Sequence, residues 1–182
     1  MTEQEWLDDA RKRITAYEGE RAMRYFDSRG IPTIGIGFNL TRADTFAALR
    51  RAGVPDDMVS RVVDGELPLT PLEIANLFDY SFAPVVSEAR ASLEVGIFDS
   101  LTDARRFVLC DLVYNLGYGG WMSFYKARML INDAQRAKIW AHGNAHELFV
   151  EAANDLRSTL WAQQVGERAV KDCAMLESGV YV

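Results

Sequence analysis

A chain of 182 residues, 49% apolar and 25% charged, has the length and composition of one ordinary folded domain, which excludes disordered and fibrous classes of protein. Acidic residues outnumber basic ones by 26 to 20, and the resulting net charge of -6 argues against nucleic-acid binding. The two cysteines, Cys110 and Cys173, lie in apolar helical patterns without a C-x-x-C motif. This favours buried thiols and synthesis in a reducing compartment over a disulfide framework.

The sequence shows no pattern typical of a signal peptide or of a membrane-spanning helix. The basic triplet Arg11-Lys12-Arg13 is not followed by the apolar stretch of a signal peptide, and no run of 18 apolar residues occurs in the chain. We therefore expect a protein made in the cytoplasm without a signal peptide and without stable membrane insertion.

The first predicted element is an amphipathic helix over residues 2 to about 17. Thr2 and Glu5 have the spacing of a capping box, and apolar residues follow at helical intervals. Gly19 is expected to end this helix, which places Glu18 at its last turn.

The character of the sequence changes between residues 22 and 40. A turn is predicted at Ser28-Arg29-Gly30, and the stretch from Thr33 to Phe38 is the only convincing β segment. Thr41-x-x-Asp44 then resembles a second helix start, and a short helix is expected over about 56 to 63.

A long helix is predicted from Thr70-Pro71-Leu72-Glu73 to about residue 92, with a kink at Pro84, as expected of a connector between two lobes. The stretch 107–116 is apolar on nearly every face, so it is expected at the centre of the second lobe, where Gly117 ends it. Shorter helical patterns follow over about 123–131, 134–140, 145–153, 158–163 and 167–176.

Two acids, Glu18 and Asp27, stand nine residues apart on either side of the helix-to-hairpin transition, and Thr33 follows. Across a groove, such a pair can cleave a glycosidic bond, because one carboxyl donates a proton to the leaving oxygen and the other stays ionised. The alternative is structural: Glu18 caps the helix or pairs with a cation, and Asp27 begins the turn through an Asx hydrogen bond.

The surrounding motifs favour the catalytic interpretation. These motifs are Tyr17-Glu18-Gly19-Glu20-Arg21, Tyr25-Phe26-Asp27, Gly30-Ile31-Pro32-Thr33-Ile34-Gly35-Ile36-Gly37 and Asn39-Leu40-Thr41. Together they resemble the N-terminal lobe of the T-even phage lysozymes, muramidase endolysins of the glycoside hydrolase class. The likeness continues with lower specificity along most of the chain.

The resemblance implies an α+β, mostly helical, two-lobed fold, in which a long helix joins a small β-hairpin lobe to a helical lobe. Its N-terminal lobe would span about 16–70, its inter-lobe helix about 70–92 and its C-terminal helical lobe about 93–182. The helix over 2–17 would pack on the C-terminal lobe of this single lysozyme-like domain.

The resemblance also implies a peptidoglycan hydrolase that cleaves the β-1,4 bond between N-acetylmuramic acid and N-acetylglucosamine with inversion. If the family's catalytic roles apply to the matching residues, Glu18 is the general acid, Asp27 is the base or electrostatic stabiliser, and Thr33 positions the attacking water. Inversion requires room for that water, so the carboxyl groups should be roughly 6.5–9.5 Å apart. No metal or organic cofactor is implied.

Four further residues are predicted to support the site. Asn115 resembles a cleft-floor amide, with a core amide as the alternative; Trp161 would line the cleft, with core packing as the alternative. Arg168 would orient the catalytic Glu, with a solvent-facing charge as the alternative. Phe38 stands where the family usually has histidine.

The expected partner is the peptidoglycan glycan strand, bound by a monomer that acts on the periplasmic wall after release through a holin or a secretion system. A phage or prophage role in host lysis is the first hypothesis. The alternatives are a secreted antibacterial effector and a non-catalytic wall-binding or virion structural module. His142 and His146 are four residues apart, but Gly143 and Asn144 between them argue against a metal site.

Overall fold

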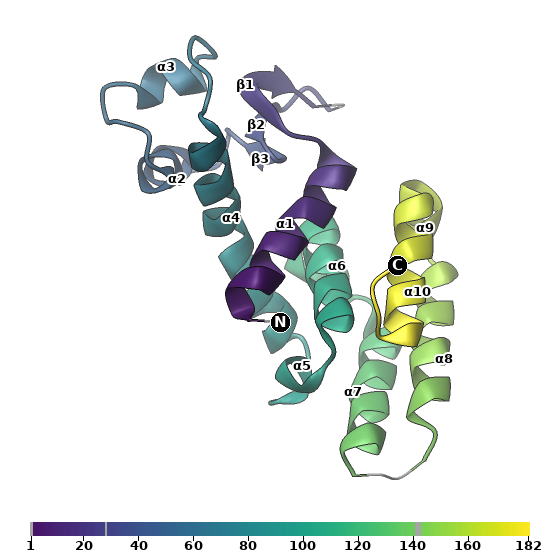
Figure 1. Ribbon diagram of the computed structural model, residues 1–182. Coiled ribbons are helices and arrows are strands. Elements are labelled where there is room, and N and C mark those ends of the chain that lie inside the picture. Colours follow the sequence, from purple (N-terminus) through teal and green to yellow (C-terminus); the bar gives the residue numbers. More distant parts are fainter. Residues whose placement is uncertain (1, 28, 141–142) are drawn as a thin grey trace. The chain divides into compact units, whose positions relative to one another are not determined.

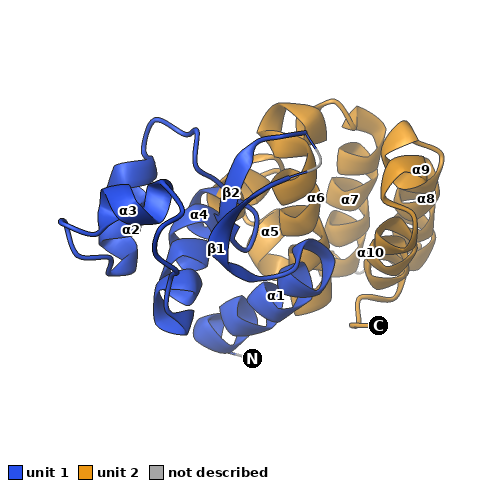
Figure 2. Cartoon of the chain, turned by 90° about the horizontal axis from the view of Figure 1, so that it is seen from above, with its two compact units in different colours: residues 1–84 blue, residues 85–182 orange. Residues whose placement is uncertain are grey.

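The computed structural model describes residues 2–27, 29–140 and 143–182 and divides the chain into two compact units (Figures 1 and 2). The first unit is Met1–Pro84 and the second is Val85–Val182. The boundary falls inside the long helix α4 (Pro71–Ala91), at its internal proline.

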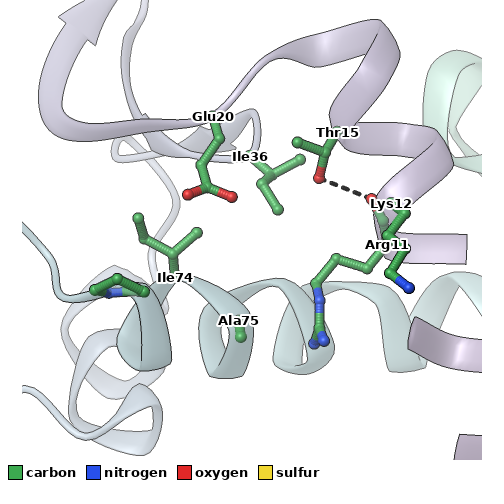
Figure 3. A pocket seen from close by; sticks show the side chains of 8 residues that line it. Arg11, Lys12, Thr15, Glu20, Ile36, Ile74 and Ala75 are labelled. Carbon is green, nitrogen blue, oxygen red and sulfur yellow. Dashed lines mark hydrogen bonds between the residues drawn. The ribbon is translucent and has the colours of Figure 1, made fainter. Parts of the chain in front are cut away.

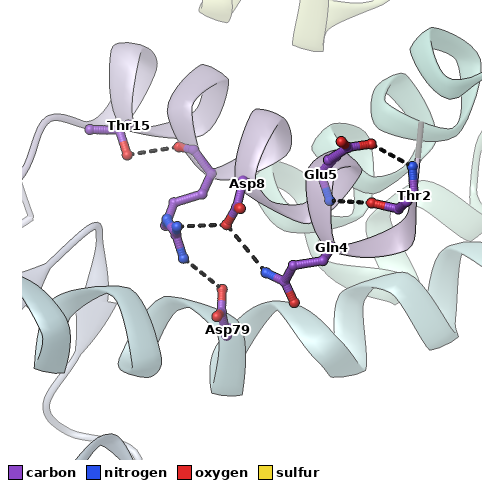
Figure 4. Close-up of polar contacts among 7 residues, drawn as sticks. Thr2, Gln4, Glu5, Asp8, Thr15 and Asp79 are labelled. Atoms are coloured by element: carbon purple, nitrogen blue, oxygen red, sulfur yellow. Dashed lines mark hydrogen bonds and ion pairs between the residues drawn. The ribbon is translucent and has the colours of Figure 1, made fainter.

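The first unit contains α1 (Glu3–Glu18), a small sheet, α2 (Thr45–Ala52), α3 (Val59–Val63) and the first part of α4. The predicted capping box at the start of α1 is confirmed. The Thr2 hydroxyl accepts from the Glu5 N–H at 3.2 Å, and the Glu5 carboxylate accepts from the Thr2 N–H at 2.8 Å (Figure 4). Gly19 ends the helix, as predicted, with a φ of 76°.

Contacts between α1 and α4 hold the first unit together. Arg11 donates to Asp8 of its own helix at 2.8 Å and to Asp79 of α4 at 3.2 Å (Figure 4). The same two helices also bring together the fully buried rings of Trp6 and Phe82, whose centroids are 6.4 Å apart. Most of the stabilisation comes from the buried rings, because half-exposed ion pairs contribute little.

The sheet has three antiparallel strands in the order β1 (Arg21–Phe26), β2 (Pro32–Gly35) and β3 (Phe38–Asn39). The expectation of a single β segment over 33–38 was wrong. That segment divides because Gly35 and Gly37 both take positive φ values, 64° and 68°, which turn the chain between β2 and β3. The strand β1 was missed because two of its six residues are arginines on the outer edge of the sheet.

The second predicted helix begins later than expected. Helix α2 starts at Thr45 and not at Thr41, because the Asn39 side chain accepts both the N–H and the hydroxyl of Thr41 in a turn. Asp44 precedes the helix without capping it through its side chain, since its carboxylate accepts from Arg42.

The second unit begins with the last turns of α4 and continues through α5 (Ile97–Ser100), α6 (Asp103–Met122), α7 (Tyr125–Ile139), α8 (Ala145–Arg157), α9 (Leu160–Val165) and α10 (Glu167–Ser178). The predicted central helix is confirmed, since α6 is buried from Phe107 to Val113. Gly117 interrupts α6 with a φ of 71°, but the helix resumes and continues to Met122.

Helix α7 is continuous where two helices, over 123–131 and 134–140, were predicted. The weak helix formers Asn132 and Asp133 suggested a break, but both side chains have partners. Asn132 accepts from the backbone N–H of Glu94 at 3.0 Å, and Asp133 pairs with Arg136. These two interactions, the first of them with a residue distant in the sequence, compensate for the low helix propensity.

The buried indole of Trp121 provides a stability test in this unit. Its N–H donates to the Ser92 hydroxyl at 2.7 Å, and that hydroxyl donates to the Ala89 carbonyl. Ser92→Ala leaves a buried N–H without an acceptor, so we expect urea unfolding to show a loss of about 1–3 kcal/mol. Ser178→Ala, which removes an exposed hydroxyl, is the control and should change stability by less than about 0.5 kcal/mol. An equal effect of both substitutions would contradict this assignment.

The predicted α+β, mostly helical fold class is confirmed, and so is the prediction that Cys110 and Cys173 are buried and form no disulfide. None of the described helices is long and apolar enough to cross a membrane. The kink at Pro84, the lobe limits and the packing of the first helix on the C-terminal lobe stay predictions.

Candidate functional site

Glu18 is the last residue of α1, and its side chain is exposed. The chain leaves the helix at Gly19, whose N–H donates to the Thr15 carbonyl at 2.8 Å, and enters β1 at Arg21. The capping glycine therefore sets the position of Glu18 at the junction of helix and sheet, as the sequence predicted.

Asp27 follows β1 directly and organises the turn into β2. Its Oδ1 accepts from the backbone N–H groups of Arg29 and Ile31, both at 2.8 Å. These hydrogen bonds, the one from Ile31 foremost, hold the pKa of the Asp27 carboxyl below its ordinary value. The Asx bond of the structural alternative is thus present, and the other carboxylate oxygen, Oδ2, lies 3.5 Å from Nε of Arg29.

Thr33 lies on β2 and is only 4% exposed. Its hydroxyl donates to the Ile31 carbonyl at 3.0 Å, and the same carbonyl accepts from the Asp27 N–H at 3.0 Å. One backbone carbonyl therefore binds both residues.

Tyr25 links these groups electrostatically, and sequence reasoning missed it. It pairs with Thr33 across the sheet, so the two side chains share a face, and the Arg21 guanidinium lies 4.6 Å from the centre of its ring. Burial raises the pKa of the Tyr25 phenol, Arg21 opposes this, and the charges of Glu18 and Asp27 both raise it further. The place of Tyr25 two residues before Asp27 in a strand was the available signal.

Phe38 lies on β3 opposite Ile34 and is buried. Its ring packs in the first unit with the Arg42 guanidinium 5.3 Å from its centre. The side chain provides packing at a position where a histidine would provide hydrogen bonds.

Asn115 and Trp161 meet in the second unit. The Trp161 indole, buried at the start of α9, donates to Oδ1 of the exposed Asn115 at 3.0 Å. The alternative of a core amide at Asn115 is wrong, whereas Trp161 is packed as core residues are. A role of either residue toward a sugar stays a prediction.

Arg168 on α10 is buried, so the alternative of a solvent-facing charge is wrong. Its Nε and Nη2 donate to the two oxygens of Asp111 on α6, both at 2.8 Å. Asp172, one turn further along α10, is fully buried beside this pair. Sequence reasoning missed both aspartates, although acids within apolar helical patterns were a visible signal.

Metal ligation has no support in residues 2–27, 29–140 and 143–182, which contain no cluster of three or more potential ligands. His146 is exposed, and His142 lies outside the described residues.

A surface cavity of about 320 Å³ lies on the first unit between α1 and α4 (Figure 3). Glu20 and Ile36 lie over it, with Ile74 and Ala75 of α4 beneath (Figure 3). Its lining excludes Glu18, Asp27 and Thr33, so the chemistry-bearing residues lie outside this cavity.

Comparison with known proteins supports the resemblance found in the sequence. No protein-family model matches the chain. The chain is 27% identical over 169 residues to the probable T4-type lysozyme 1 of Dictyostelium discoideum, and 26% identical over 165 residues to the probable T4-type lysozyme 2 of that organism. Each alignment covers 89% of both proteins. The chain is also 25% identical over 166 residues to the pre-baseplate central spike protein Gp5 of Enterobacteria phage T4. This alignment covers 89% of the chain and 26% of the phage protein. The predicted resemblance to T4-type lysozymes is confirmed.

Proposed function

We propose that this chain is a muramidase that hydrolyses the β-1,4 bond between N-acetylmuramic acid and N-acetylglucosamine in peptidoglycan. One observation supports the proposal: a single backbone carbonyl, that of Ile31, accepts hydrogen bonds from both the Asp27 N–H and the Thr33 hydroxyl. The similarity to T4-type lysozymes along most of the chain supports it.

Glu18 acts as the general acid. Its exposed carboxyl at the end of a helix can donate a proton to the glycosidic oxygen as the bond breaks. Asp27 acts as the ionised partner, because its lowered pKa keeps it negative throughout the neutral range.

The hydrogen bonds at Asp27 and Thr33 determine how water would be held. Oδ1 of Asp27 already accepts two backbone N–H groups, which leaves Oδ2 to accept from a water. The Thr33 hydroxyl donates its proton to Ile31, so its oxygen also acts as an acceptor. A water that donates one proton to each residue directs a lone pair outward, toward the anomeric carbon. This arrangement gives an inverting displacement, for which the two carboxyl groups need a separation of roughly 6.5–9.5 Å.

The second unit contributes substrate binding in this proposal. Asn115 is exposed and held in orientation by the buried Trp161, which suits an amide that binds an N-acetyl group. Arg168 keeps its predicted part as a supporting residue.

The biological role that we propose is host cell lysis by a phage or prophage, by a monomer that reaches the periplasmic wall through a holin or a secretion system. The net charge of -6 gives weak attraction to an anionic wall, so a partner would hold the enzyme there. The match to a phage spike protein favours a second candidate, the same activity carried on a virion.

Product analysis tests the proposal. Purified peptidoglycan digested by the wild-type chain should yield fragments with reducing N-acetylmuramic acid ends by mass spectrometry, and rapid NMR should detect the α anomer first. Anhydromuramic ends would indicate a lytic transglycosylase, and released peptides would indicate an amidase or peptidase. If permeabilised Gram-negative cells are not cleared at any salt concentration, the chain is a non-catalytic wall-binding module.

A further inference from the structure

A buried cluster of one cation and two carboxyl groups lies in the second unit. Asp111 and Asp172 have no exposed surface, and Arg168 is 8% exposed. Arg168 donates two charge-assisted hydrogen bonds to Asp111, one to each carboxylate oxygen.

Asp172 is the unusual member of this cluster. Neither of its buried oxygens has a hydrogen-bond donor among the described residues. An ionised carboxylate can only accept hydrogen bonds, so an ionised Asp172 would be buried without solvation. A protonated carboxyl has an O–H to donate, and Asp111 lies within hydrogen-bonding reach as an acceptor.

We infer that Asp172 retains a proton at neutral pH and donates it to Asp111, so that the two acids present one negative charge to Arg168. Three buried ionisable groups then sum to zero charge, and each acquires a hydrogen-bond partner. Asp111 and Asp172 thereby act as positioning residues for Arg168, and this second step rests on the proposed function, in which Arg168 is a supporting residue.

The electrostatics support the inference. Burial raises the pKa of Asp172 well above its ordinary value, and the nearby negative charge of Asp111 raises it further, while Arg168 lowers it. Two carboxyl groups this close share a proton because both cannot ionise together at low cost.

Within residues 2–27, 29–140 and 143–182, Arg168 is the one cation that acts on Asp172. Cys173, the next residue on α10, is buried with its thiol pKa raised to about 11, and Arg157 of α8 lies near that thiol. Glu177 of α10 pairs with Arg157. Helix α9 contributes no charged residue, and Asp111 is the acid that faces Asp172 from α6.

The first experiment is direct and needs no substrate. Carbon NMR of the full chain labelled at aspartate carboxyl carbons should show Asp172 protonated at neutral pH. In Asp111→Asn, Arg168 loses its anionic partner, and an ionised Asp172 should replace it. The titration of Asp172 should therefore move to lower pH by more than about one unit. A wild-type Asp172 signal that is ionised at neutral pH would overturn the inference.

Stability gives a second measurement without substrate. Because the folded state holds the proton above the unfolded pKa, stability should fall as pH rises from about 4 toward the folded pKa. Asp172→Asn, whose amide can donate to Asp111, should remove this slope and raise Tm at mildly alkaline pH by at least about 2 °C. The control is Asp56→Asn, an exposed carboxyl on the first unit, which should leave the slope unchanged.

Activity separates the positioning role from the proton itself. When Asp172 ionises, the cluster gains a second negative charge, which attracts the Arg168 guanidinium away from its position at neutral pH. The value of kcat should therefore fall at alkaline pH. In Asp172→Asn this fall should occur at higher pH. A fall at the same pH in an active Asp172→Asn enzyme would overturn the positioning role. A chain without wall-cleaving activity would contradict the proposed function, while NMR and unfolding would still decide the state of Asp172.

Discussion

Glu18→Gln is expected to lower the rate of glycan cleavage by about 10²–10⁴-fold while the chain remains folded. Glutamine keeps the shape of the side chain but has no acidic proton for the leaving oxygen. Because a negative charge at a helix C-terminus opposes the helix dipole, removing the charge should change stability by no more than about 1 kcal/mol. Loss of activity without loss of stability is characteristic of a functional residue.

The measurement is the initial rate of clearing of permeabilised Gram-negative cells, together with thermal unfolding of the same samples. Glu20→Gln is the matched control, since Glu20 is also exposed, lies two residues further along and lines the separate cavity. The control should retain most of the activity. If Glu18→Gln cleared cells at more than about a tenth of the wild-type rate, Glu18 would not be the general acid.

The elements that the sequence predicts well are those defined by local signals. The capping box at Thr2 and the glycine at position 19 fix α1, and therefore the place of Glu18, within a few residues of chain. The Asx bond of Asp27 is equally local, because both N–H donors lie within four residues of it.

The sheet was predicted less well because strand pairing depends on partners distant in the sequence. Nothing in the exposed, arginine-containing stretch of β1 identifies a strand until β2 pairs with it. The continuity of α7 likewise depends on Asn132 contacting the backbone at Glu94, 38 residues earlier.

The charged cluster shows the same limit for the site. Arg168 was predicted as a supporting residue, but its partner Asp111 is 57 residues away in the sequence. Whether an arginine is solvated or buried depends on tertiary packing, which periodicity alone does not determine. The spacing of Arg168 and Asp172, four apart on a helix, indicates only that they share a face.

Arg168→Met is expected to lower the free energy of unfolding at neutral pH by about 3–5 kcal/mol, because it leaves the buried Asp111 without its cation. Methionine retains much of the aliphatic volume, so little of the loss comes from packing. Urea unfolding measures the effect. Lys126→Met is the control: it removes an exposed pair with Asp155 at 3.6 Å and should cost no more than about 1 kcal/mol.

The pH dependence of this loss distinguishes a buried charge from a packing defect. Without Arg168, Asp111 is buried without a cation, which favours its protonated form. The folded variant therefore binds more protons than the unfolded chain above pH ~4. Its stability should therefore recover partly as pH falls toward that value, and the difference from wild type should shrink. A difference that stays constant between neutral and mildly acidic pH would show that Arg168 stabilises the second unit through its methylene groups and not through its charge.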